Sequence, residues 1–493
     1  MGTRILAWVT TMHELPWRVC ARARLARDPR FDGKFFIGVR GSGVYCRPIC
    51  PAPTAKEKNC TYFPTAAAAA EAGYRPCLRC RPESSPGTPA WLGTSTTVSR
   101  ALRLIDETGP EDGGVEGLAA RLGVGARHLR RLFLKHLGAT PNAVAQTRRV
   151  HFAKKLIDET NLPMTELAIA AGYGCVRRFN DAIRKTYHRT PTQIRALARG
   201  TKSLPENHYL FRLRFRPPYD WKGILSFLAA SAIPGVEAVD GISYRRTISL
   251  KGSDGAFEVS LDPKYPALLA RIQFGDPRAL FFIVERIRAL FDLNADWSPI
   301  EKVLALDPLL KPRLKSAPGL RVPGCWNGFE LAVQTIVAEG CSDASAVVGR
   351  FVQTFGRQFL AGPGLTHLFP DAETLAEAQL QRAGLPPGSC NSVRALARAV
   401  RSGEIVFDRA TESRGFVASL RKVAGMDEPT AQYVAMRALG EPDAFPVGNK
   451  ALKARSASWC PWRAYAAMYL WDEARLAANG RPAKRPATGA ARA

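Results

Sequence analysis

The chain has 493 residues, 46% of them hydrophobic, so it is long enough for about three domains with buried cores. Its formal charge of +27 predicts a polyanionic partner, with nucleic acid as the first candidate, although a GC-rich genome that favours arginine would have the same effect. No run of about 18 apolar residues and no signal-peptide pattern occur, which excludes a membrane protein and predicts a cytoplasmic one. Its eleven cysteines are then expected to be thiols or metal ligands rather than disulfides.

The first module, over residues 1–85, contains two close pairs of cysteines. Cys46 and Cys50 form a C-x3-C pair in "GVYCRPIC", and Cys77 and Cys80 form a C-x2-C pair in "RPCLRC". Four thiolates on two loops suit the tetrahedral coordination of Zn²⁺, and the metal would replace a core that so short a module cannot build. We therefore expect one zinc ion on these four cysteines. The alternative is four unrelated buried thiols.

The second module is helical. A linker over 86–97, in "SSPGTPAWLGTSTT", is followed over 98–200 by apolar residues at three- and four-residue spacing with little strand signal. Within it, one pair of helices is expected around a turn at Gly123, with the second helix beginning near Gly125. A second pair is expected around a turn at Gly172. The pattern predicts an all-α module built from two helix-turn-helix units.

The third part begins as a sheet. In "HYLFRLRFRPP", Phe211, Leu213 and Phe215 alternate with arginines, and this two-residue period predicts a strand. The stretches "YRRTISL" and "FEVSL" are further strand candidates. The expected order of the remaining parts is a sheet domain (204–290), a helical domain (291–475) and a disordered basic tail (476–493).

The cysteine module resembles a known family. On "DGKFFIGVRGSGVYCRPICPAP" and "AGYRPCLRCRPE", residues 20–83 look like the N-terminal domain of the bacterial Ada adaptive-response proteins. In that family the first cysteine of the C-R-P-x-C motif takes a methyl group from a DNA methylphosphotriester, which implies that Cys46 is the acceptor. Zinc keeps such a thiol deprotonated at neutral pH, so a ligand can also be a nucleophile. Methylation would remove one negative charge beside the DNA backbone and so tighten DNA binding. Each chain would react only once, because nothing in the sequence regenerates the thiolate.

The helical module resembles the paired helix-turn-helix domain of AraC-type regulators. The resemblance rests on "VEGLAARLGVGARHLRRLFLKHLGATP" and "MTELAIAAGYGCVRRFNDAIRKTYHRTP". In that fold the second helix of each unit enters the major groove, which implies promoter DNA as a partner and RNA polymerase as another. The implied DNA contacts are Arg127, His128 and Arg131 in the first unit, and Cys175, Arg177 and Arg178 in the second. The alternative is a helical bundle with solvated arginines.

Residues 205 to about 475 resemble the AlkA alkyladenine glycosylases, on "GLRVPGCWNGFELAVQTIV", "TAQYVAMRALGEPDAFP" and "WCPWRAYAAMYLW". Such enzymes flip an alkylated base into a pocket and cleave its glycosidic bond. A helix-hairpin-helix offers backbone N–H groups to a phosphate, and an aspartate after it stabilises the developing cation. The hairpin corresponds to "VAGMDEPTA", which implies DNA contacts at Gly425, Asp427 and Thr430.

The chain departs from the glycosylase pattern at several positions. Asp427 replaces the second hairpin glycine, and we expect it to disrupt the tight turn and to put a negative charge where a phosphate approaches. Pro429 replaces the lysine of lyase-competent relatives, so no Schiff base is expected. Asn449, in "FPVGNKALK", stands at the catalytic aspartate, and an amide lacks the charge that stabilises an oxocarbenium-like centre. The loop Lys450–Ser458 is expected to be short, and Asp443 is a candidate replacement carboxylate.

The predicted fold class is multidomain: a small zinc-stabilised α/β module, an all-α double helix-turn-helix, an α+β sheet domain and an all-α helix-hairpin-helix glycosylase fold. The predicted function is repair of and response to DNA alkylation in the bacterial nucleoid. It combines methyl transfer to Cys46, transcriptional regulation and a DNA-3-methyladenine glycosylase impaired by Asn449. Two alternatives are a non-enzymatic zinc regulator with a DNA-holding C-terminal module, and a working glycosylase with accessory DNA-binding domains. Met12 is a candidate for the true start.

Overall fold

The computed structural model describes residues 15–86, 96–108, 114–197, 205–341, 343–409 and 411–477. Met12, residues 87–95 of the predicted linker and residues 478–493 of the predicted tail lie outside this range. The chain forms two compact units. The first comprises Met1–Pro217, Asp262–Arg286 and Leu293–Ala295, and the second comprises Pro218–Leu261, Ile287–Asp292 and Asp296–Ala493.

The first unit begins with a four-stranded sheet of order β3-β1-β2-β4, in which only the β2–β4 pairing is parallel. Its elements are α2 (Trp17–Leu25), β1 (Phe36–Val39), β2 (Val44–Cys46), β3 (Cys60–Phe63), α3 (Ala66–Glu71) and β4 (Arg75–Pro76). One cluster of its core contains only four buried residues, Cys20, Ala23, Phe35 and Ile37. A metal bound to the four cysteines would add to the stability that this cluster provides.

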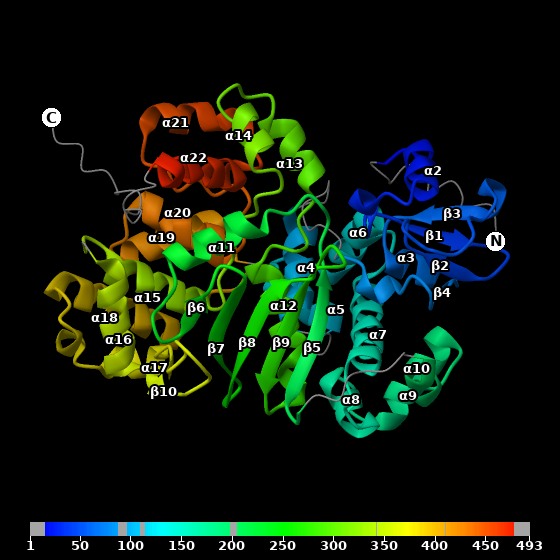
Figure 1. Cartoon of the computed structure of the whole chain (residues 1–493), viewed down its shortest axis with the longest axis horizontal. Helices are drawn as coiled ribbons and strands as arrows, with labels where there is room; N and C mark the ends of the chain where they lie inside the picture. Colours follow the sequence, from blue (N-terminus) through cyan, green and yellow to red (C-terminus); the bar gives the residue numbers. More distant parts are fainter. Residues whose placement is uncertain are drawn as a thin grey trace. The chain divides into compact units, whose positions relative to one another are not determined.

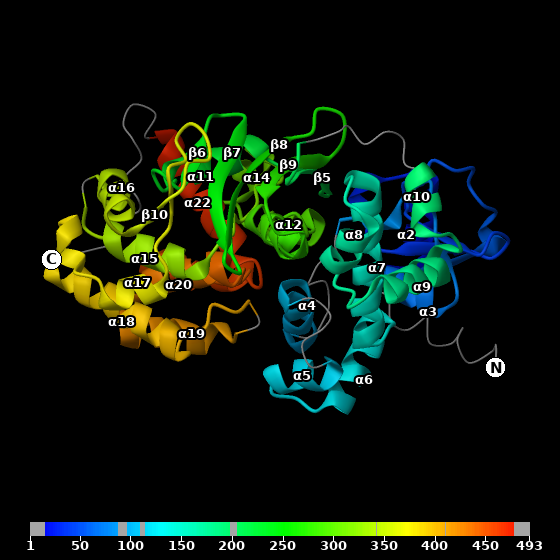
Figure 2. The same ribbon diagram turned by 90° about the horizontal axis from the view of Figure 1, so that it is seen from below.

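The next part of the first unit is all-α, as the sequence predicts. Its helices are α4 (Thr96–Thr108), α5 (Gly114–Arg121), α6 (Ala126–Leu137), α7 (Pro141–Glu159), α8 (Met164–Ala170), α9 (Val176–Tyr187) and α10 (Pro191–Leu197). The two predicted turns are confirmed, because Gly123 and Gly172 have φ of +67° and +76°, a conformation that glycine adopts without strain. Helix α7 joins the two helix-turn-helix motifs: α4 to α6 gather at one of its ends and α8 to α10 at the other (Figure 1, Figure 2).

Two antiparallel strands complete the first unit, β5 (His208–Arg214) and β9 (Ala267–Phe274). Phe211 and Leu213 are fully buried on β5, which confirms the predicted two-residue period, although the strand ends before Phe215. Arg216 follows the strand and is 1% exposed. Its guanidinium donates to the carbonyl oxygens of three separate segments, those of Asp32 (2.8 Å), Asn294 (2.8 Å) and Pro86 (3.4 Å).

The second unit contains an antiparallel meander and a helical core. Its first elements are α11 (Trp221–Ala230), β6 (Glu237–Val239), β7 (Ser243–Leu250) and β8 (Ser253–Leu261), and β7 pairs with both neighbours. After α12 (Leu280–Leu290), which the boundary between the units crosses, come α13 (Trp297–Leu304), α14 (Lys311–Ser316), α15 (Gly328–Ala338), α16 (Ala344–Phe355), β10 (Arg357–Gln358), β11 (His367–Leu368), α17 (Ala372–Glu377), α18 (Pro387–Ser402), α19 (Ser413–Ala424), α20 (Glu428–Ala438), α21 (Lys450–Arg455) and α22 (Arg463–Ala477).

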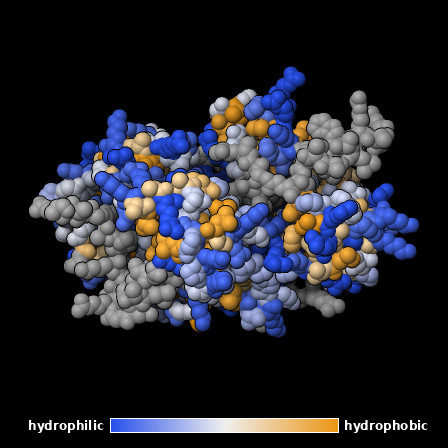
Figure 3. Space-filling model, turned by 90° about the horizontal axis from the view of Figure 1, so that it is seen from above, coloured by the Kyte–Doolittle hydropathy of each residue, from blue (hydrophilic) through white to orange (hydrophobic). Residues whose placement is uncertain are grey.

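The core of the second unit lies among its helices. One cluster contains apolar residues of α15, α16, α18, α19 and α20, among them Phe329, Phe351, Leu396, Leu420 and Val434. In the face seen in Figure 3, hydrophilic side chains cover much of the surface and hydrophobic ones form smaller groups. No described helix is long and apolar enough to cross a membrane.

Candidate functional site

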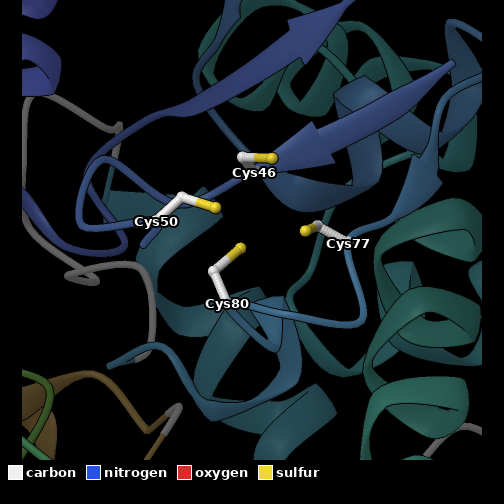
Figure 4. A group of neighbouring side chains, drawn as sticks. All are labelled: Cys46, Cys50, Cys77 and Cys80. Atoms are coloured by element: carbon white, nitrogen blue, oxygen red, sulfur yellow. The ribbon is translucent and has the colours of Figure 1, made fainter. Parts of the chain in front are cut away.

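The four predicted zinc ligands come together. The sulfur atoms of Cys46, Cys50, Cys77 and Cys80 lie within 4.8 Å of one another, and Figure 4 shows their side chains converging on one centre. Cys46 ends β2 and Cys77 follows β4, so the parallel pairing of these strands sets the two loops side by side. A tetrahedral Zn²⁺ with Zn–S bonds of about 2.3 Å needs sulfurs about 3.8 Å apart. The four thiols fit that requirement and confirm the predicted zinc site.

Arg47 lies in the Cys46–Cys50 loop and joins it to the Cys77–Cys80 loop through hydrogen bonds. Its side chain is 2% exposed, and it forms a bidentate ion pair with Asp32, with Nε 2.7 Å from Oδ1. Its Nη1 donates to the carbonyl oxygen of Cys80 (2.9 Å), and its backbone N–H donates to the Cys80 sulfur (3.4 Å). The sequence analysis missed this role, although a basic residue between two ligands in "CRPIC" was a signal for it.

The four sulfurs are not equivalent. Cys46 and Cys50 are half-buried, whereas Cys77 and Cys80 are buried. Three sulfurs accept a backbone N–H: Cys50 from Ala52, Cys77 from Cys80, and Cys80 from Arg47. The main interactions of the Cys46 sulfur are with neighbouring sulfurs. An N–H donor withdraws electron density from a thiolate, and contacts with other sulfurs do so less, so Cys46 stays the predicted methyl acceptor.

Hydrogen bonds among the four thiols shift their pKa values in opposite directions. Hydrogen bonds to Cys50 and Cys77 raise the pKa of Cys46, and hydrogen bonds to its three neighbours raise the pKa of Cys80. Cys77 accepts from the other three, which lowers its pKa, and a hydrogen bond with Cys46 lowers the pKa of Cys50 to about 7. A dication takes the place of these protons, so zinc binding must release protons and weaken in acid.

The predicted DNA contacts of the helical module lie on exposed helix faces. Arg127, His128 and Arg131 are exposed on α6, where the Arg131 guanidinium lies 3.0 Å from the His128 ring. The opposite face of α6 is buried in the module. In the second helix-turn-helix motif, Cys175 is the N-cap of α9 and is exposed, as are Arg177 and Arg178. The structure therefore presents all six side chains to solvent, and their contact with DNA stays a prediction.

The helix-hairpin-helix is formed by α19 and α20. Helix α19 ends at Gly425, with φ of +67°, and Asp427 is the N-cap of α20, with its Oδ1 accepting from the Thr430 N–H at 2.8 Å. The expectation that Asp427 disrupts the turn is wrong, because its φ of −68° is open to any residue. Its carboxylate nevertheless occupies the helix N-terminus that the family pattern offers to a phosphate.

Asn449 lies beside this hairpin and is itself a helix cap. Its Oδ1 accepts from the Leu452 N–H (3.1 Å) at the start of α21. A Cβ atom on the preceding Gly448 would lie 3.8 Å from Pro429 Cγ, so this segment borders the N-terminus of α20. The segment 450–458, predicted to be shorter than in relatives, is helical, because α21 runs directly into a 3₁₀ turn at Ser456–Trp459.

Two carboxylates near this segment are already paired. Asp443 forms a bidentate ion pair with Arg463, at 2.8 and 2.7 Å. Asp307 accepts from Arg455 Nε (2.7 Å) and Trp459 Nε1 (2.7 Å), and the bond to Arg455 lowers its pKa to about 2. Asp307 thereby anchors α21, a positioning role that the sequence analysis did not predict.

Three family models match the chain: the metal binding domain of Ada over residues 19–83, a helix-turn-helix domain over 118–196 and the AlkA N-terminal domain over 210–327. The last match includes parts of both compact units.

Curated relatives match the same parts and also the whole chain. The chain is 38% identical over 125 residues, 25% of this chain and 34% of the relative, to the "Bifunctional transcriptional activator/DNA repair enzyme Ada" of Escherichia coli. It is 28% identical over 53% of its length, and 96% of the relative, to the E. coli "DNA-3-methyladenine glycosylase 2". A "Probable bifunctional transcriptional activator/DNA repair enzyme AlkA" of Mycobacterium tuberculosis is 38% identical over 474 residues, 92% of this chain and 95% of the relative. The chain therefore belongs to the family of bifunctional transcriptional activator/DNA repair enzymes AlkA.

Proposed function

We propose that this protein detects and repairs methylated DNA by transferring a methyl group to Cys46. The observation that carries this proposal is the cluster of four cysteines in which Cys46 combines partial access with contacts to sulfurs. Bound zinc would keep the four thiols deprotonated at neutral pH. The Cys46 sulfur attacks the methyl carbon of a methylphosphotriester, an S–C bond forms and the C–O bond breaks. The electron pair stays on the phosphate oxygen, which becomes an ordinary phosphodiester anion.

Methylation also converts the site into a signal. The Cys46 thioether carries no charge, so the site loses one negative charge and its repulsion of the DNA backbone falls. Helices α6 and α9 then read promoter DNA in the major groove, through Arg127, His128 and Arg131 and through Cys175, Arg177 and Arg178. Recruitment of RNA polymerase in the cytoplasm, at the nucleoid, completes the proposed response. The predicted domain boundaries at 85, 98, 200, 204, 290 and 475 divide these roles along the chain.

The glycosylase fold is proposed to be impaired. Asn449 supplies an amide where the family pattern has a carboxylate, and that amide caps α21. Arg463 holds the alternative carboxylate of Asp443 in a bidentate pair. At the hairpin, Gly425 and Thr430 keep the helix-hairpin-helix geometry, while Asp427 competes with a DNA phosphate for the N-terminus of α20. Loss of charge stabilisation in such a site typically slows the reaction by about 10²–10³-fold.

Methyl transfer is tested with the purified zinc protein and a duplex that carries methylphosphotriesters. Mass spectrometry should find one methyl group per chain on Cys46, and none in Cys46→Ser. Cys60→Ser is the matched control, because Cys60 is a half-buried thiol of the same module outside the four-cysteine cluster. Equal transcriptional responses of wild type and Cys46→Ser to a methylating agent would instead favour a regulator with purely structural zinc.

The glycosylase is tested by release of 3-methyladenine from methylated duplex DNA. Asn449→Asp should release the base and the wild type should be at least about 100-fold slower. Asn327→Asp is the control, since Asn327 caps α15 in the same way that Asn449 caps α21. Equal release by wild type and Asn449→Asp would show that another group supplies the charge and that the module is a working glycosylase.

A further inference from the structure

The zinc module contacts the helix-turn-helix module through residues adjacent to its metal ligands. Tyr45 directly precedes Cys46 and is 1% exposed. Its hydroxyl lies 2.8 Å from Nε2 of His151, which is on α7. Burial lowers the pKa of His151 to about 4, so the ring is neutral at pH 7, and its tautomer sets which partner donates in this hydrogen bond. The strand that carries the methyl acceptor is thus hydrogen-bonded to the helix that joins the two DNA-reading units.

A buried ionic network forms a second connection beside Cys80. Arg81 follows that ligand and pairs with Asp158 (2.6 Å) near the end of α7. Glu83 pairs with Lys154 of α7 (3.4 Å), and their side chains are 1% and 5% exposed. Buried charges are costly unless each has its partners, so a network of this kind stabilises one orientation of its two sides and penalises others.

The zinc module also contacts the ends of both predicted recognition helices. Thr65 donates to the carbonyl oxygen of Leu137, the last residue of α6, at 2.9 Å. A Cβ atom on the next residue, Gly138, would lie 3.3 Å from Ala68 of α3, so α3 packs closely there. Helix α9 contacts β4 and ends at Tyr187, which is 2% exposed. One small module therefore contacts α6, α7 and α9 together.

We infer that the zinc module is an orienting clamp, which holds the two recognition helices in the arrangement needed to read DNA together. This inference rests on the proposed DNA-reading role of α6 and α9. Two recognition helices must enter successive stretches of the major groove at a fixed spacing, and α7 alone joins them along the chain. The clamp fixes that spacing through its contacts with α6, α7 and α9. Tyr45 and Arg81 are sequence neighbours of the zinc ligands Cys46 and Cys80, so the metal centre fixes the position of the two residues that contact α7. None of the proposed DNA-reading residues is itself a zinc ligand.

The test uses the full-length zinc protein and a Glu83→Gln variant, which keeps the shape of the side chain and removes its charge. The control is Glu57→Gln, since Glu57 pairs with buried Arg24 in the same module. Zinc content is measured first, followed by amide hydrogen exchange of 141–159 and 176–187. Binding is measured to a duplex that the methylated wild type enriches from a random-sequence pool. Glu83→Gln should retain zinc, exchange at least about fivefold faster in both segments and bind the enriched duplex about tenfold more weakly.

Exchange and affinity of Glu83→Gln equal to those of Glu57→Gln would overturn the clamp. If Glu83→Gln loses zinc, the same measurements on Tyr45→Phe decide, with Tyr62→Phe as its control. Tyr62 is in the same sheet, and its hydroxyl donates to Glu57 rather than to α7. If Tyr45→Phe then matches Tyr62→Phe, the clamp is wrong. If the wild type enriches no sequence, the DNA-reading role fails, and hydrogen exchange alone decides the clamp.

Discussion

Replacing Arg47 with methionine should weaken zinc binding severely. The substitution keeps most of the side-chain volume but removes the cation that pairs with Asp32, whose side chain is 6% exposed. It also removes the donor to the Cys80 carbonyl. An uncompensated buried charge costs about 3–5 kcal/mol. Folding and metal binding of so small a module are one equilibrium, so this cost should appear as a loss of zinc affinity between about 100-fold and several thousand-fold.

The assay is competition for zinc at pH 7 between the full-length protein and chelators of graded affinity. Arg24→Met is the control, because Arg24 is also buried in the zinc module but its partner Glu57 is 42% exposed and can be solvated when the pair is broken. Adding Asp32→Leu to Arg47→Met should restore part of the affinity by removing the stranded carboxylate. Zinc affinity of Arg47→Met within about threefold of wild type would refute the reasoning, since it would show that Asp32 tolerates the loss of its cation.

Three further outcomes are expected. Asp307→Asn should lower the unfolding free energy of the α21 region by about 1–2 kcal/mol at pH 7, measured by hydrogen exchange. Because the pKa of Asp307 is about 2, the difference between variant and wild type should vanish as the pH falls toward 2 and Asp307 itself becomes protonated. The pKa of His151 is about 4 in the folded state and about 6.5 when unfolded, so its contribution to stability is constant above pH 6.5 and falls by about 3 kcal/mol as the pH drops to 4. His151→Gln should show a smaller fall in urea unfolding, and an equal fall would contradict this. Chelation of zinc at neutral pH should unfold the sheet module before α4 to α10, as followed by hydrogen exchange.

The features predicted correctly from the sequence are those encoded by close spacing. The pairs Cys46–Cys50 and Cys77–Cys80 are each local, and a metal requires only that the two loops meet. The turns at Gly123 and Gly172 are equally local, because each needs one residue with positive φ between two apolar helical patterns. Such signals do not depend on the rest of the fold.

The features that the sequence analysis missed depend on contacts between distant segments. Asp32 and Arg47 are fifteen residues apart, and nothing in either stretch shows that they form a buried pair. The prediction that Asp427 disrupts the turn is wrong for a local reason, because the backbone there has φ of −68°, which needs no glycine, and the position serves as a helix cap. Tertiary contact therefore explains the missed ion pair, whereas the hairpin prediction failed on a local backbone conformation.

Arg216 links the C-terminal portion of the chain to the stability of its N-terminal portion. This link does not depend on cleavage of glycosidic bonds. The strand before this arginine belongs to the glycosylase-like part of the sequence, yet its guanidinium donates to the carbonyls of Asp32 and Pro86 in the sensor part. A chain shortened to its sensor and regulator parts would lose that donor, so the stability of the sensor part gives selection a reason to keep the adjoining sequence that does not depend on catalysis.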